Sequence, residues 1–596
     1  MLELEQKFDI NKARKELEGD RITVGIATCG VAAGAVPVLE QLQKAGLGML
    51  VEGVGCAGMC YAEPIVTVKQ KGIFSIYGYV STDKVGILID SIKKGEECKE
   101  LFMGHTLEEI DFFKKQKRML MENCGTISPL KLEQYMARGG YCGLKNALAK
   151  KPLDVVEDVK KAGLRGRGGA GFSTGMKWSF IASKPGKKYV ICNADEGDPG
   201  AFMNRTVMES DPFRLIEGLT IAGYATGAQN GLIYIRAEKP LAKKTITEAR
   251  NIARKVGLLG ENILGVDGFN FDIKVFSGAG AFVCGEETAL MRSAEGDRGN
   301  PMPRPPYPAD KGLYGYPSAI NNVGTLCHVS TIMKIGAENY AKVGTERTKG
   351  THTICLTGNI KRTGIMEVPL GITLREIIYD IGGGCPDGSE FKAVQSGGPS
   401  GGCIPKEKID TPVDYETLNA LGAIMGSGGM VVMSNKDCMV DVAKYFMQFV
   451  QEESCGKCTP CREGTRRMLE LLTKVTDGLA DETTIPTLKK LASFVKDNSL
   501  CALGQTAANP VLSTLLYFEE EYKAHIIGKE CPSKSCKNLT KYFISDKCKG
   551  CGNCARNCPV NAITGKLKER YVIDHKKCVK CGKCYEVCAF DAIVRN

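Results

Sequence analysis

A cysteine pattern that occurs twice near the end of the chain constrains this sequence more than any other feature. Cys548-x2-Cys551-x2-Cys554-x3-Cys558 recurs 30 residues later as Cys578-x2-Cys581-x2-Cys584-x3-Cys588. Three thiolates spaced in this way can wrap one [4Fe–4S] cubane, and the fourth cysteine of each run ligates the other cluster. We therefore predict two clusters, one held by Cys548, Cys551, Cys554 and Cys588 and the other by Cys578, Cys581, Cys584 and Cys558.

A zinc site in a nucleic-acid-binding protein is the alternative for this repeat. Zinc ligands normally come as cysteine pairs separated by a spacer, without a third cysteine two residues further on. The repeat resembles bacterial two-cluster ferredoxins. It departs from them at Ala589, where their motif has proline, and we expect this change to alter the loop and not the ligation.

Length and composition narrow the class of protein. A chain of 596 residues exceeds what one core normally organises, so we expect several domains. The N-terminal segment is charged, and no run of about 18 apolar residues occurs, so we expect a cytoplasmic protein without a signal peptide or membrane span. The odd count of 27 cysteines argues against complete disulfide pairing and favours metal or redox chemistry.

The net charge of +11 does not require a nucleic-acid partner. Thiolates are not included in that figure, and each cluster held by four thiolates carries roughly −2 charges. Three such clusters would cancel about half of the excess, so we expect no nucleic acid to bind.

Two further sets of residues have the spacing of metal ligands. Cys455, Cys458 and Cys461 lie in a turn before a helical pattern, and with Cys501 they are predicted to hold a third [4Fe–4S] cluster. The looser spacing of His525, Cys531 and Cys536 suits tetrahedral zinc, with Cys438 as the predicted fourth ligand. Residues without a metal are the alternative for the second set.

A glycine-rich loop, GLRGRGGAGFSTG at 163–175, precedes a helical pattern. Glycines allow the backbone to approach a phosphate, and a helix N-terminus favours an anion. The loop alone is weak evidence, because no clear strand precedes it and tight-turn packing explains it equally well. Three more motifs accompany it, namely CNADEGDPG at 192–200, GAGAFVCGEET at 278–288 and AINNV at 319–323.

These four motifs together resemble the NADH-binding flavoprotein subunit of respiratory complex I and the diaphorase subunits of soluble hydrogenases, over roughly residues 125–515. The resemblance implies an FMN held by Gly166, Arg167, Gly168, Gly171, Lys177, Asn193, Asp195, Gly285, Glu286, Asn321 and Asn322. It also implies a nicotinamide cofactor stacked on Phe172 and Phe180, for which core packing is the alternative. Asp198, Arg304 and Tyr307 stand where that family has Glu, Lys and Phe, so the choice between NAD and NADP stays open.

The N-terminal cysteines Cys29, Cys56 and Cys60 resemble the thioredoxin-like [2Fe–2S] domain of the same assemblies. That domain normally has four cysteines, and the first pair here retains one. Three thiolates leave one iron under-ligated unless another group substitutes. A docking domain without a cluster is the alternative.

We predict a multidomain α/β protein. The alternation of strand and helix patterns after Leu153 indicates a mostly parallel sheet, with 318–333 predicted as a helix. The predicted parts are a thioredoxin-like domain (1–104), a helical linker (105–150), an FMN- and NAD(P)-binding domain of the complex I flavoprotein type (151–346), a β-grasp-like domain (347–435), a helical bundle with a [4Fe–4S] cluster (436–530) and a two-cluster ferredoxin-like domain (531–596).

This arrangement resembles the flavoprotein (beta) subunit of NAD(P)-dependent, electron-bifurcating iron hydrogenases. The resemblance implies an NAD(P)H dehydrogenase (diaphorase) subunit, whose FMN exchanges hydride with NAD(P)H and single electrons with the clusters. It implies a hydrogenase-type catalytic subunit, a small [2Fe–2S] subunit and ferredoxin as partners. The alternatives are a diaphorase subunit of an NAD-dependent formate dehydrogenase or flavin-based transhydrogenase, a zinc-rich nucleic-acid-binding protein, and a non-catalytic scaffold.

Overall fold

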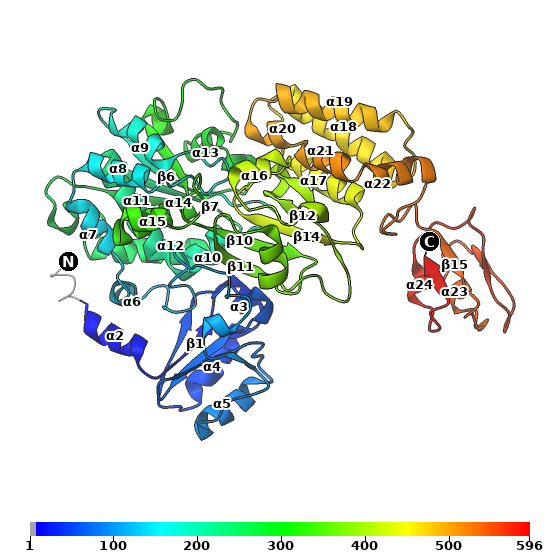
Figure 1. Ribbon diagram of the computed structural model, residues 1–596, viewed down its shortest axis with the longest axis horizontal. Helices are drawn as coiled ribbons and strands as arrows, with labels where there is room; N and C mark the ends of the chain where they lie inside the picture. The colour runs from blue at the N-terminus through cyan, green and yellow to red at the C-terminus, as the bar shows by residue number, and fades with distance from the viewer. Residues whose placement is uncertain (1–7, 596) are drawn as a thin grey trace. The chain divides into compact units, whose positions relative to one another are not determined.

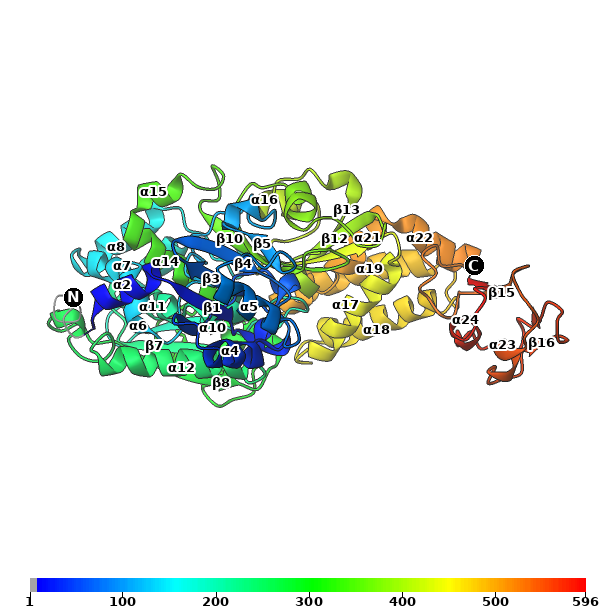
Figure 2. The same cartoon turned by 90° about the horizontal axis from the view of Figure 1, so that it is seen from below.

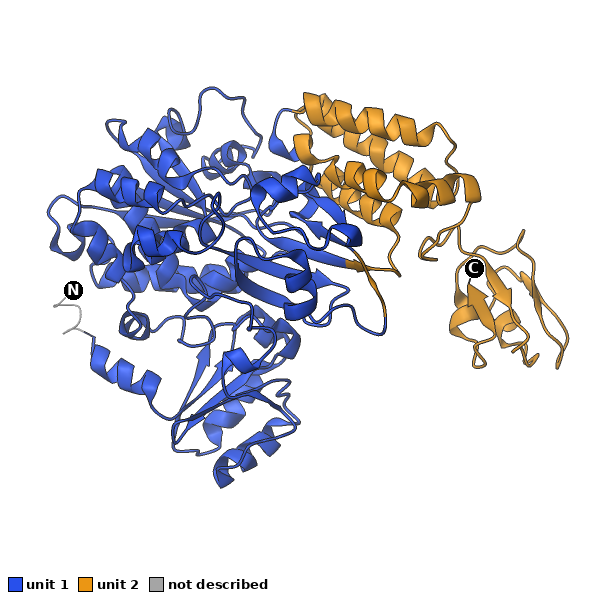
Figure 3. Cartoon of the chain, in the orientation of Figure 1, with its two compact units in different colours: residues 1–388, 393–432, 500–503 blue, residues 389–392, 433–499, 504–596 orange. Residues whose placement is uncertain are grey.

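The computed structural model describes residues 8–595. The chain divides into two compact units, the first comprising the residues up to 388 with 393–432 and 500–503, and the second comprising 389–392, 433–499 and 504–596 (Figure 3). Among residues 8–595, no helix combines the length and the apolar character that crossing a membrane requires.

The N-terminal part of the first unit contains a five-stranded sheet and several helices. The strands are β1 (Arg21–Gly25), β2 (Leu50–Val54), β3 (Val66–Gln70), β4 (Ile73–Tyr77) and β5 (Phe102–Gly104), in the order β2-β1-β3-β4-β5. The helices are α2 (Ile10–Glu18), α3 (Thr28–Ala32), α4 (Ala35–Lys44) and α5 (Val85–Lys94). Val38 and Leu42 of α4, and Leu88 and Ile92 of α5, are buried because residues four apart share one helix face.

The segment 105–131, predicted as helical linker, instead forms turns that are packed into the first unit. Glu367 on β11 (Gly364–Pro369) accepts hydrogen bonds from the backbone N–H groups of Met119, Leu120 and Met121 at 2.8–3.0 Å. This buried carboxylate supplies the partners that a helix would otherwise provide. Within the predicted linker, α-helix occurs only in α6 (Leu132–Ala137) and α7 (Cys142–Leu148).

A parallel four-stranded sheet lies at the centre of the first unit, in the order β8-β7-β6-β9. Its strands are β6 (Tyr189–Ala194), β7 (Asn230–Arg236), β8 (Asp272–Gly278) and β9 (Ser318–Asn322). The helices of this region are α8 (Pro152–Lys161), α9 (Thr174–Ala182), α10 (Met203–Ser210), α11 (Pro212–Thr226), α12 (Pro240–Lys255), α13 (Glu287–Ala294), α14 (Val323–Ile335) and α15 (Ala337–Ala341). The almost wholly buried α11 packs against α14 and β6 (Figure 1). Because the strands are parallel, the loops that follow them converge at one edge of the sheet.

The run 318–333, predicted as one helix, is a strand followed by a helix. Ser318–Asn322 pairs in parallel with β6, and α14 begins at Val323, where the Asn322 side chain accepts a hydrogen bond from Gly324 N at 2.8 Å. A strand buried on both faces lacks the alternation of apolar and polar residues that distinguishes strand from helix.

A second, mixed sheet has the strand order β11-β10-β14-β12-β13. Its other strands are β10 (Thr351–Gly358), β12 (Phe391–Ser396), β13 (Gly402–Pro405) and β14 (Gly429–Ser434). β10 pairs antiparallel with β11 and parallel with β14. The connection before β14 contains α16 (Tyr415–Ala420), whose first residues reach the glycine-rich loop.

The second unit contains a helical bundle and a small β-containing domain. The bundle comprises α17 (Met439–Glu453), α18 (Thr459–Thr476), α19 (Thr484–Asn498), α21 (Asn509–Tyr517) and α22 (Glu519–Lys523). The first three of these helices lie side by side in both views (Figures 1 and 2). The last domain has its own apolar core and comprises β15 (Tyr542–Ile544), α23 (Asn553–Arg556), β16 (Ile563–Thr564), β17 (Val572–Ile573), α24 (Lys583–Glu586) and β18 (Ile593–Arg595).

Candidate functional site

The glycine-rich loop lies between α8 and α9 and does not follow a strand. Gly169 has a φ of 117° and forms a backbone bridge with Gly426, and Tyr415 Oη donates a hydrogen bond to Gly166 O at 2.7 Å. Tyr415 and Gly426 belong to the connection before β14, so the second sheet helps to build this loop. This contribution was not predicted, and the glycines between 422 and 429 are its only signal in the sequence.

Two glycines of the predicted flavin site each have room for a larger side chain. A Cβ at Gly166 would meet nothing nearer than Phe172 O at 3.6 Å, and a Cβ at Gly285 nothing nearer than Asp195 O at 3.7 Å. Neither glycine has a positive φ, so neither packing nor backbone conformation requires glycine there. Gly171 differs, because its φ is 63° and a Cβ would lie 2.8 Å from the Tyr415 ring. The room at Gly166 and at Gly285 fits a group that the backbone approaches closely, as a flavin phosphate or ring requires.

Hydrogen bonds at the carboxyl end of β6, a strand of the parallel sheet, link three of the predicted flavin residues. Asn193 Nδ2 donates to Gly285 O at 2.8 Å, and Asn193 Oδ1 accepts from Asp195 N at 3.1 Å. The Asp195 carboxylate lies 3.6 Å from Arg236 Nε, at the end of β7. These bonds hold the predicted residues Asn193, Asp195 and Gly285 together at one edge of the sheet.

Helix α9 brings a lysine to the same edge. Lys177 Nζ donates to Ile320 O at 3.0 Å and lies 3.6 Å from a carboxylate oxygen of Glu287. The adjacent Trp178 is fully buried and donates from Nε1 to Asn321 Oδ1 at 2.9 Å. The tryptophan therefore attaches α9 to β9, and the lysine places a cation suited to a phosphate or a carboxylate beside the loop.

The Arg167 side chain is held by backbone carbonyl oxygens. Its guanidinium is buried and donates to the carbonyl oxygens of Arg165, Lys349 and Thr351 at 2.6–3.0 Å. Its backbone N–H donates to Thr325 Oγ1 at 2.8 Å. The side chain therefore connects the loop to the start of β10.

The two phenylalanines predicted to stack on the nicotinamide lie at the surface. Phe172 and Phe180 are 48% and 49% exposed, so these rings are not core side chains. Glu286 caps α13 by accepting hydrogen bonds from the first N–H groups of the helix, and it also binds Arg304. Arg304 Nη1 lies 3.0 Å from Glu287, so two carboxylates surround this guanidinium. Tyr307, three residues after Arg304 in the chain, is also exposed.

Asp198 contacts residues in the connections between strands of the second sheet. Ser427 Oγ donates to its carboxylate at 3.1 Å, and a Cβ at Gly398 would lie only 2.6 Å from its carboxyl carbon. Burial raises the pKa of the Asp198 carboxyl to about 6. Ser427 and Gly398 are further contributions that were not predicted.

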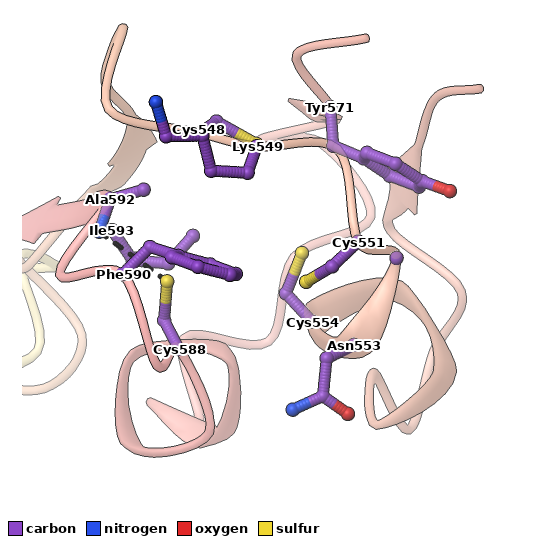
Figure 4. A pocket seen from close by; sticks show the side chains of 11 residues that line it. Cys548, Lys549, Cys551, Asn553, Cys554, Tyr571, Cys588, Phe590, Ala592 and Ile593 are labelled. Carbon is purple, nitrogen blue, oxygen red and sulfur yellow. Dashed lines mark hydrogen bonds between the residues drawn. The ribbon is translucent and has the colours of Figure 1, made fainter. Parts of the chain in front are cut away.

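The eight cysteines of the C-terminal repeat gather into two pockets of four. Cys548, Cys551, Cys554 and Cys588 line one pocket (Figure 4), and Cys558, Cys578, Cys581 and Cys584 line the other. Each pocket therefore takes three cysteines from one copy of the repeat and the last cysteine from the other. The N–H groups of Gly550, Ala562, Lys580 and Ala592 donate to cysteine sulfurs at 3.2–3.4 Å. Such bonds stabilise thiolates and tune the potential of a cluster.

The third predicted cluster set begins where α18 begins. Cys458 is the N-cap of this helix, Cys461 is buried in its first turn, and Cys455 lies just before it. Ser454 Oγ and Cys461 Sγ are 3.3 Å apart. The positive end of the helix dipole would attract the negative charge of a cluster bound at this position. Cys501 directly precedes α20 (Ala502–Thr506).

The predicted zinc ligands lie together in the second unit. The ligand atoms of Cys438, His525, Cys531 and Cys536 are all within 4.8 Å of one another, and all four residues are buried. His525 Nε2 is 3.4 Å from Cys438 Sγ and 3.3 Å from Cys536 Sγ, and its Nδ1 is 2.7 Å from Glu521 O. The carbonyl oxygen favours a proton on Nδ1, which leaves the Nε2 lone pair for a metal. Three sulfurs and one imidazole nitrogen fit tetrahedral zinc.

The sulfurs of Cys29, Cys56 and Cys60 form a second close group, within 4.8 Å of one another. Gly34 stands where the four-cysteine pattern has its other cysteine. It is the N-cap of α4, with a φ of 93°, and nothing lies within 4 Å of where its Cβ would be.

Three family models match successive parts of the chain. Residues 159–331 match the Nuo51 FMN-binding domain, 441–525 the NADH-ubiquinone oxidoreductase-F iron–sulfur binding region, and 547–592 the 4Fe-4S dicluster domain. The fold and the site therefore define an iron–sulfur flavoprotein. These matches confirm the predicted multidomain α/β fold, and they support FMN and [4Fe–4S] clusters as cofactors.

Known proteins similar to the chain give its family. NADP-reducing hydrogenase subunit HndC of Solidesulfovibrio fructosivorans is 52% identical over 485 residues, which cover 81% of this chain and 99% of that protein. The second F-type subunit of NADH-quinone oxidoreductase from Rhizobium meliloti is 44% identical, covering 67% of this chain and 96% of that protein. A crystal structure of NAD+-reducing [NiFe]-hydrogenase in the H2-reduced state matches with a TM-score of 0.62 and 27% identity, covering 88% of this chain and 89% of that chain.

The chain belongs to the family formed by the F-type subunits of NADH-quinone oxidoreductase and the related hydrogenase flavoprotein subunits. It is an NAD(P)H-oxidising flavoprotein oxidoreductase subunit, as its resemblance to these proteins predicted.

Proposed function

We propose that this chain is the electron-dividing flavoprotein subunit of a soluble hydrogenase complex. The observation that carries the proposal is one polypeptide with an FMN-binding domain, a [4Fe–4S] region and a two-cluster domain, 52% identical to a hydrogenase subunit over 99% of that subunit. When bound, FMN accepts a hydride, which is two electrons with one proton, and releases the electrons singly to iron–sulfur centres. The residues of the chain bind and orient the two cofactors and position the clusters.

The residues proposed to hold FMN lie on the glycine-rich loop, on α9, at the carboxyl ends of β6 and β9, and after β8. Lys177 offers a cation for the phosphate, and Gly166 and Gly285 leave room for the ring system. Arg167 contributes its backbone and not its side chain. The other proposed contacts are Gly168, Gly171, Asn193, Asp195, Glu286, Asn321 and Asn322.

The proposed nicotinamide site uses the exposed rings of Phe172 and Phe180 as stacking surfaces. Arg304 and Asp198 are proposed to contact the polar parts of NAD or NADP. The carboxylates of Glu286 and Glu287 balance the charge of the Arg304 guanidinium and hold it in a defined position before the cofactor binds.

We propose three [4Fe–4S] clusters and one zinc ion in the second half of the chain. The four-cysteine pockets support the ligand sets predicted for the two C-terminal clusters. The third cluster is assigned to Cys455, Cys458, Cys461 and Cys501. The buried group of Cys438, His525, Cys531 and Cys536 supports a structural zinc.

Ferredoxin is the proposed partner of the two-cluster domain, alongside a hydrogenase-type catalytic subunit and a small [2Fe–2S] subunit. Residues 537–596 contain thirteen lysines and arginines but five aspartates and glutamates. Lys547 and Lys549 are exposed beside Cys548, and Lys576 and Lys577 are exposed close to Cys578. A basic surface around clusters steers an acidic electron carrier to them. Cysteine-ligated clusters need reduced thiols, which supports a cytoplasmic location.

The function is tested on the anaerobically purified complex, with the partner subunits retained. Hydrogen should reduce NAD(P)+ and ferredoxin together, and neither acceptor should be reduced at full rate without the other. The double variant Lys547→Glu/Lys549→Glu should lower kcat/KM for ferredoxin about tenfold at low salt, because a basic patch raises association rates.

The matched control is Lys243→Glu/Lys244→Glu, which changes two exposed lysines of α12. This variant should reduce ferredoxin normally. Reduction by formate in place of hydrogen would reassign the chain to a formate dehydrogenase complex. Independent reduction of the two acceptors would contradict electron division.

The raised pKa of Asp198 gives a pH-dependence for nicotinamide binding. Above about pH 6 the carboxylate is ionised and can accept hydrogen bonds from cofactor hydroxyl groups. As the pH falls through 6 it is protonated, and KM for NAD(P)H should rise while kcat changes little. Steady-state dye reduction between pH 5 and 8 measures this. Asp198→Asn should have a raised KM at pH 8 and a flat profile, and a wild-type profile in this variant would exclude the contact.

A further inference from the structure

We propose that Cys29, Cys56, Cys60 and Glu63 form a site for a single zinc ion, in place of a [2Fe–2S] cluster. Cys29 lies on α3, at the start of the segment that follows β1, and the other three residues follow β2. The carboxylate of Glu63 replaces the cysteine that the sequence lacks at Gly34.

The distances between the sulfurs favour a single ion. Cys29 Sγ and Cys56 Sγ are 3.3 Å apart, and all three sulfurs lie within 4.8 Å of one another. Ligands on one tetrahedral zinc, with Zn–S bonds of about 2.3 Å, stand about 3.8 Å apart. In a [2Fe–2S] cluster the ligands are divided between two irons, with the bridging sulfides between them. Three ligand sulfurs of a [2Fe–2S] cluster therefore cannot all lie as close to one another as these three do.

The rest of the molecule provides an internal comparison. Within residues 8–595, the other group of cysteine and histidine ligand atoms this close together is the set around His525, which has the composition of a zinc site. The cysteines of the two C-terminal pockets surround their pockets and form no such group among the described residues. Each ligand of a cubane sits on a separate iron, so wider spacing is expected there.

The proposed fourth ligand, Glu63, lies beside Cys29 but outside the group of three sulfurs within 4.8 Å of one another, so its carboxylate would move toward the other two sulfurs when the ion binds. Its Oε1 lies 3.4 Å from Cys29 Sγ, close to the separation of about 3.6 Å expected for sulfur and oxygen on one zinc. Ile65 N donates to the other carboxylate oxygen at 3.0 Å, which orients the group. No lysine, arginine or histidine pairs with Glu63 in the described part of the chain. A metal ion would supply the missing positive charge.

Two glycines lie beside this carboxylate. A Cβ at Gly30 would lie 2.1 Å from Gly25 O and 3.2 Å from Glu63 Oε2, and a Cβ at Gly25 would lie 3.3 Å from the same oxygen. The two glycines therefore make room for the Glu63 side chain beside Cys29.

A zinc ion here would fasten the N-terminal domain. It would join the segments after β1 and β2, and both segments bind the end of α10. Thr28 N donates to the Glu209 carboxylate at 2.8 Å, and Cys56 N donates to Ser210 Oγ at 3.0 Å. Zinc has no redox chemistry, so this site would hold the domain against the flavin-binding region without carrying electrons.

Metal and sulfide analysis of the full chain, purified anaerobically, tests the proposal. We expect two zinc ions per chain, one at each close group, with about 12 irons and about 12 sulfides from three cubanes. Cys60→Ala should lose one zinc and no iron, and Cys536→Ser should lose the other zinc. Cys98→Ala is the matched control, because Cys98 is a buried thiol of the same domain outside the ligand group, and it should retain both ions.

Glu63→Gln decides the role of the carboxylate, because it keeps the shape of the side chain. This variant should release its N-terminal zinc at a chelator concentration at least tenfold lower than the wild type, with bound FMN unchanged as the check on folding. Zinc-edge X-ray absorption of Cys536→Ser should show three sulfurs and one oxygen around the remaining ion.

Three outcomes would overturn the site. Two additional irons and sulfides that disappear in Cys60→Ala would identify a [2Fe–2S] cluster. A single zinc in the wild type would mean that the N-terminal group binds none. Unchanged zinc release by Glu63→Gln would exclude the carboxylate as a ligand. None of these results depends on hydrogenase activity, so they are distinct from a failure of the proposed function.

Discussion

Cys458→Ser should lose one cluster, about four irons per chain, and should lower electron transfer from NAD(P)H to ferredoxin about 100-fold or more. A cubane with three thiolates and a serine hydroxyl is poorly held, and this cluster is the proposed exit for electrons from the flavin. FMN binding should persist, because the glycine-rich loop and the ends of β6 and β9 are unchanged. Anaerobic stopped-flow measurement should therefore show the flavin bleached by NAD(P)H at the normal rate while ferredoxin stays oxidised.

Cys142→Ser is the control for this prediction. Cys142 begins α7, is half-buried like Cys458, and belongs to none of the predicted ligand sets. Its substitution should leave the iron content and both rates unchanged. A Cys458→Ser protein with a full complement of iron and normal ferredoxin reduction would refute the assigned ligand set.

Gly285→Leu should produce a chain that contains its clusters but little FMN. The leucine side chain would extend into the space that Gly285 leaves clear, since its Cβ meets nothing nearer than 3.7 Å in the protein itself. Overpacking of this kind costs about 1–3 kcal/mol, so the Kd for FMN should rise up to about 100-fold. Flavin content after gel filtration and the quenching of FMN fluorescence on titration measure the effect.

Gly86→Leu provides the comparison. Gly86 lies in α5, has no positive φ, and has nothing within 4 Å of its Cβ position, so this leucine should be accommodated on the surface. It should bind FMN like the wild type. If Gly285→Leu also retained full FMN affinity, the space beside Gly285 would not be part of the flavin site.

The cysteine spacing shows which parts of the metal sites can be predicted from local sequence. Ligands within a few residues of each other must lie close in any fold, so the triplets around the starts of α18, α23 and α24 could be recognised without a structure. The exchange of Cys558 and Cys588 between the repeats was also predictable, and the structure brings those residues to the predicted pockets. The motifs around the glycine-rich loop identified the family, because four ordered motifs rarely occur together by chance.

Long-range hydrogen bonds and packing were not predictable in the same way. The turns at 105–131 depend on Glu367, which lies more than 240 residues away and replaces the hydrogen bonds of a helix. The strand Ser318–Asn322 is buried on both faces, so its sequence lacks the alternation that would have separated it from the helix that follows. Arg167 lies within a flavin motif, yet its guanidinium binds the backbone at Lys349 and Thr351.

The amino-acid sequence by itself therefore predicted the class of chemistry, because the short-range spacing of the cysteines indicates iron–sulfur clusters and the four ordered motifs indicate an FMN-binding domain. Only the tertiary structure decided which distant groups complete each site. Tyr415 and Ser427, from the connection before β14, reach the loop and Asp198 respectively, and Glu63 lies beside Cys29. The physical reason is that such contacts depend on how separate elements pack, and no local pattern in the chain records that packing.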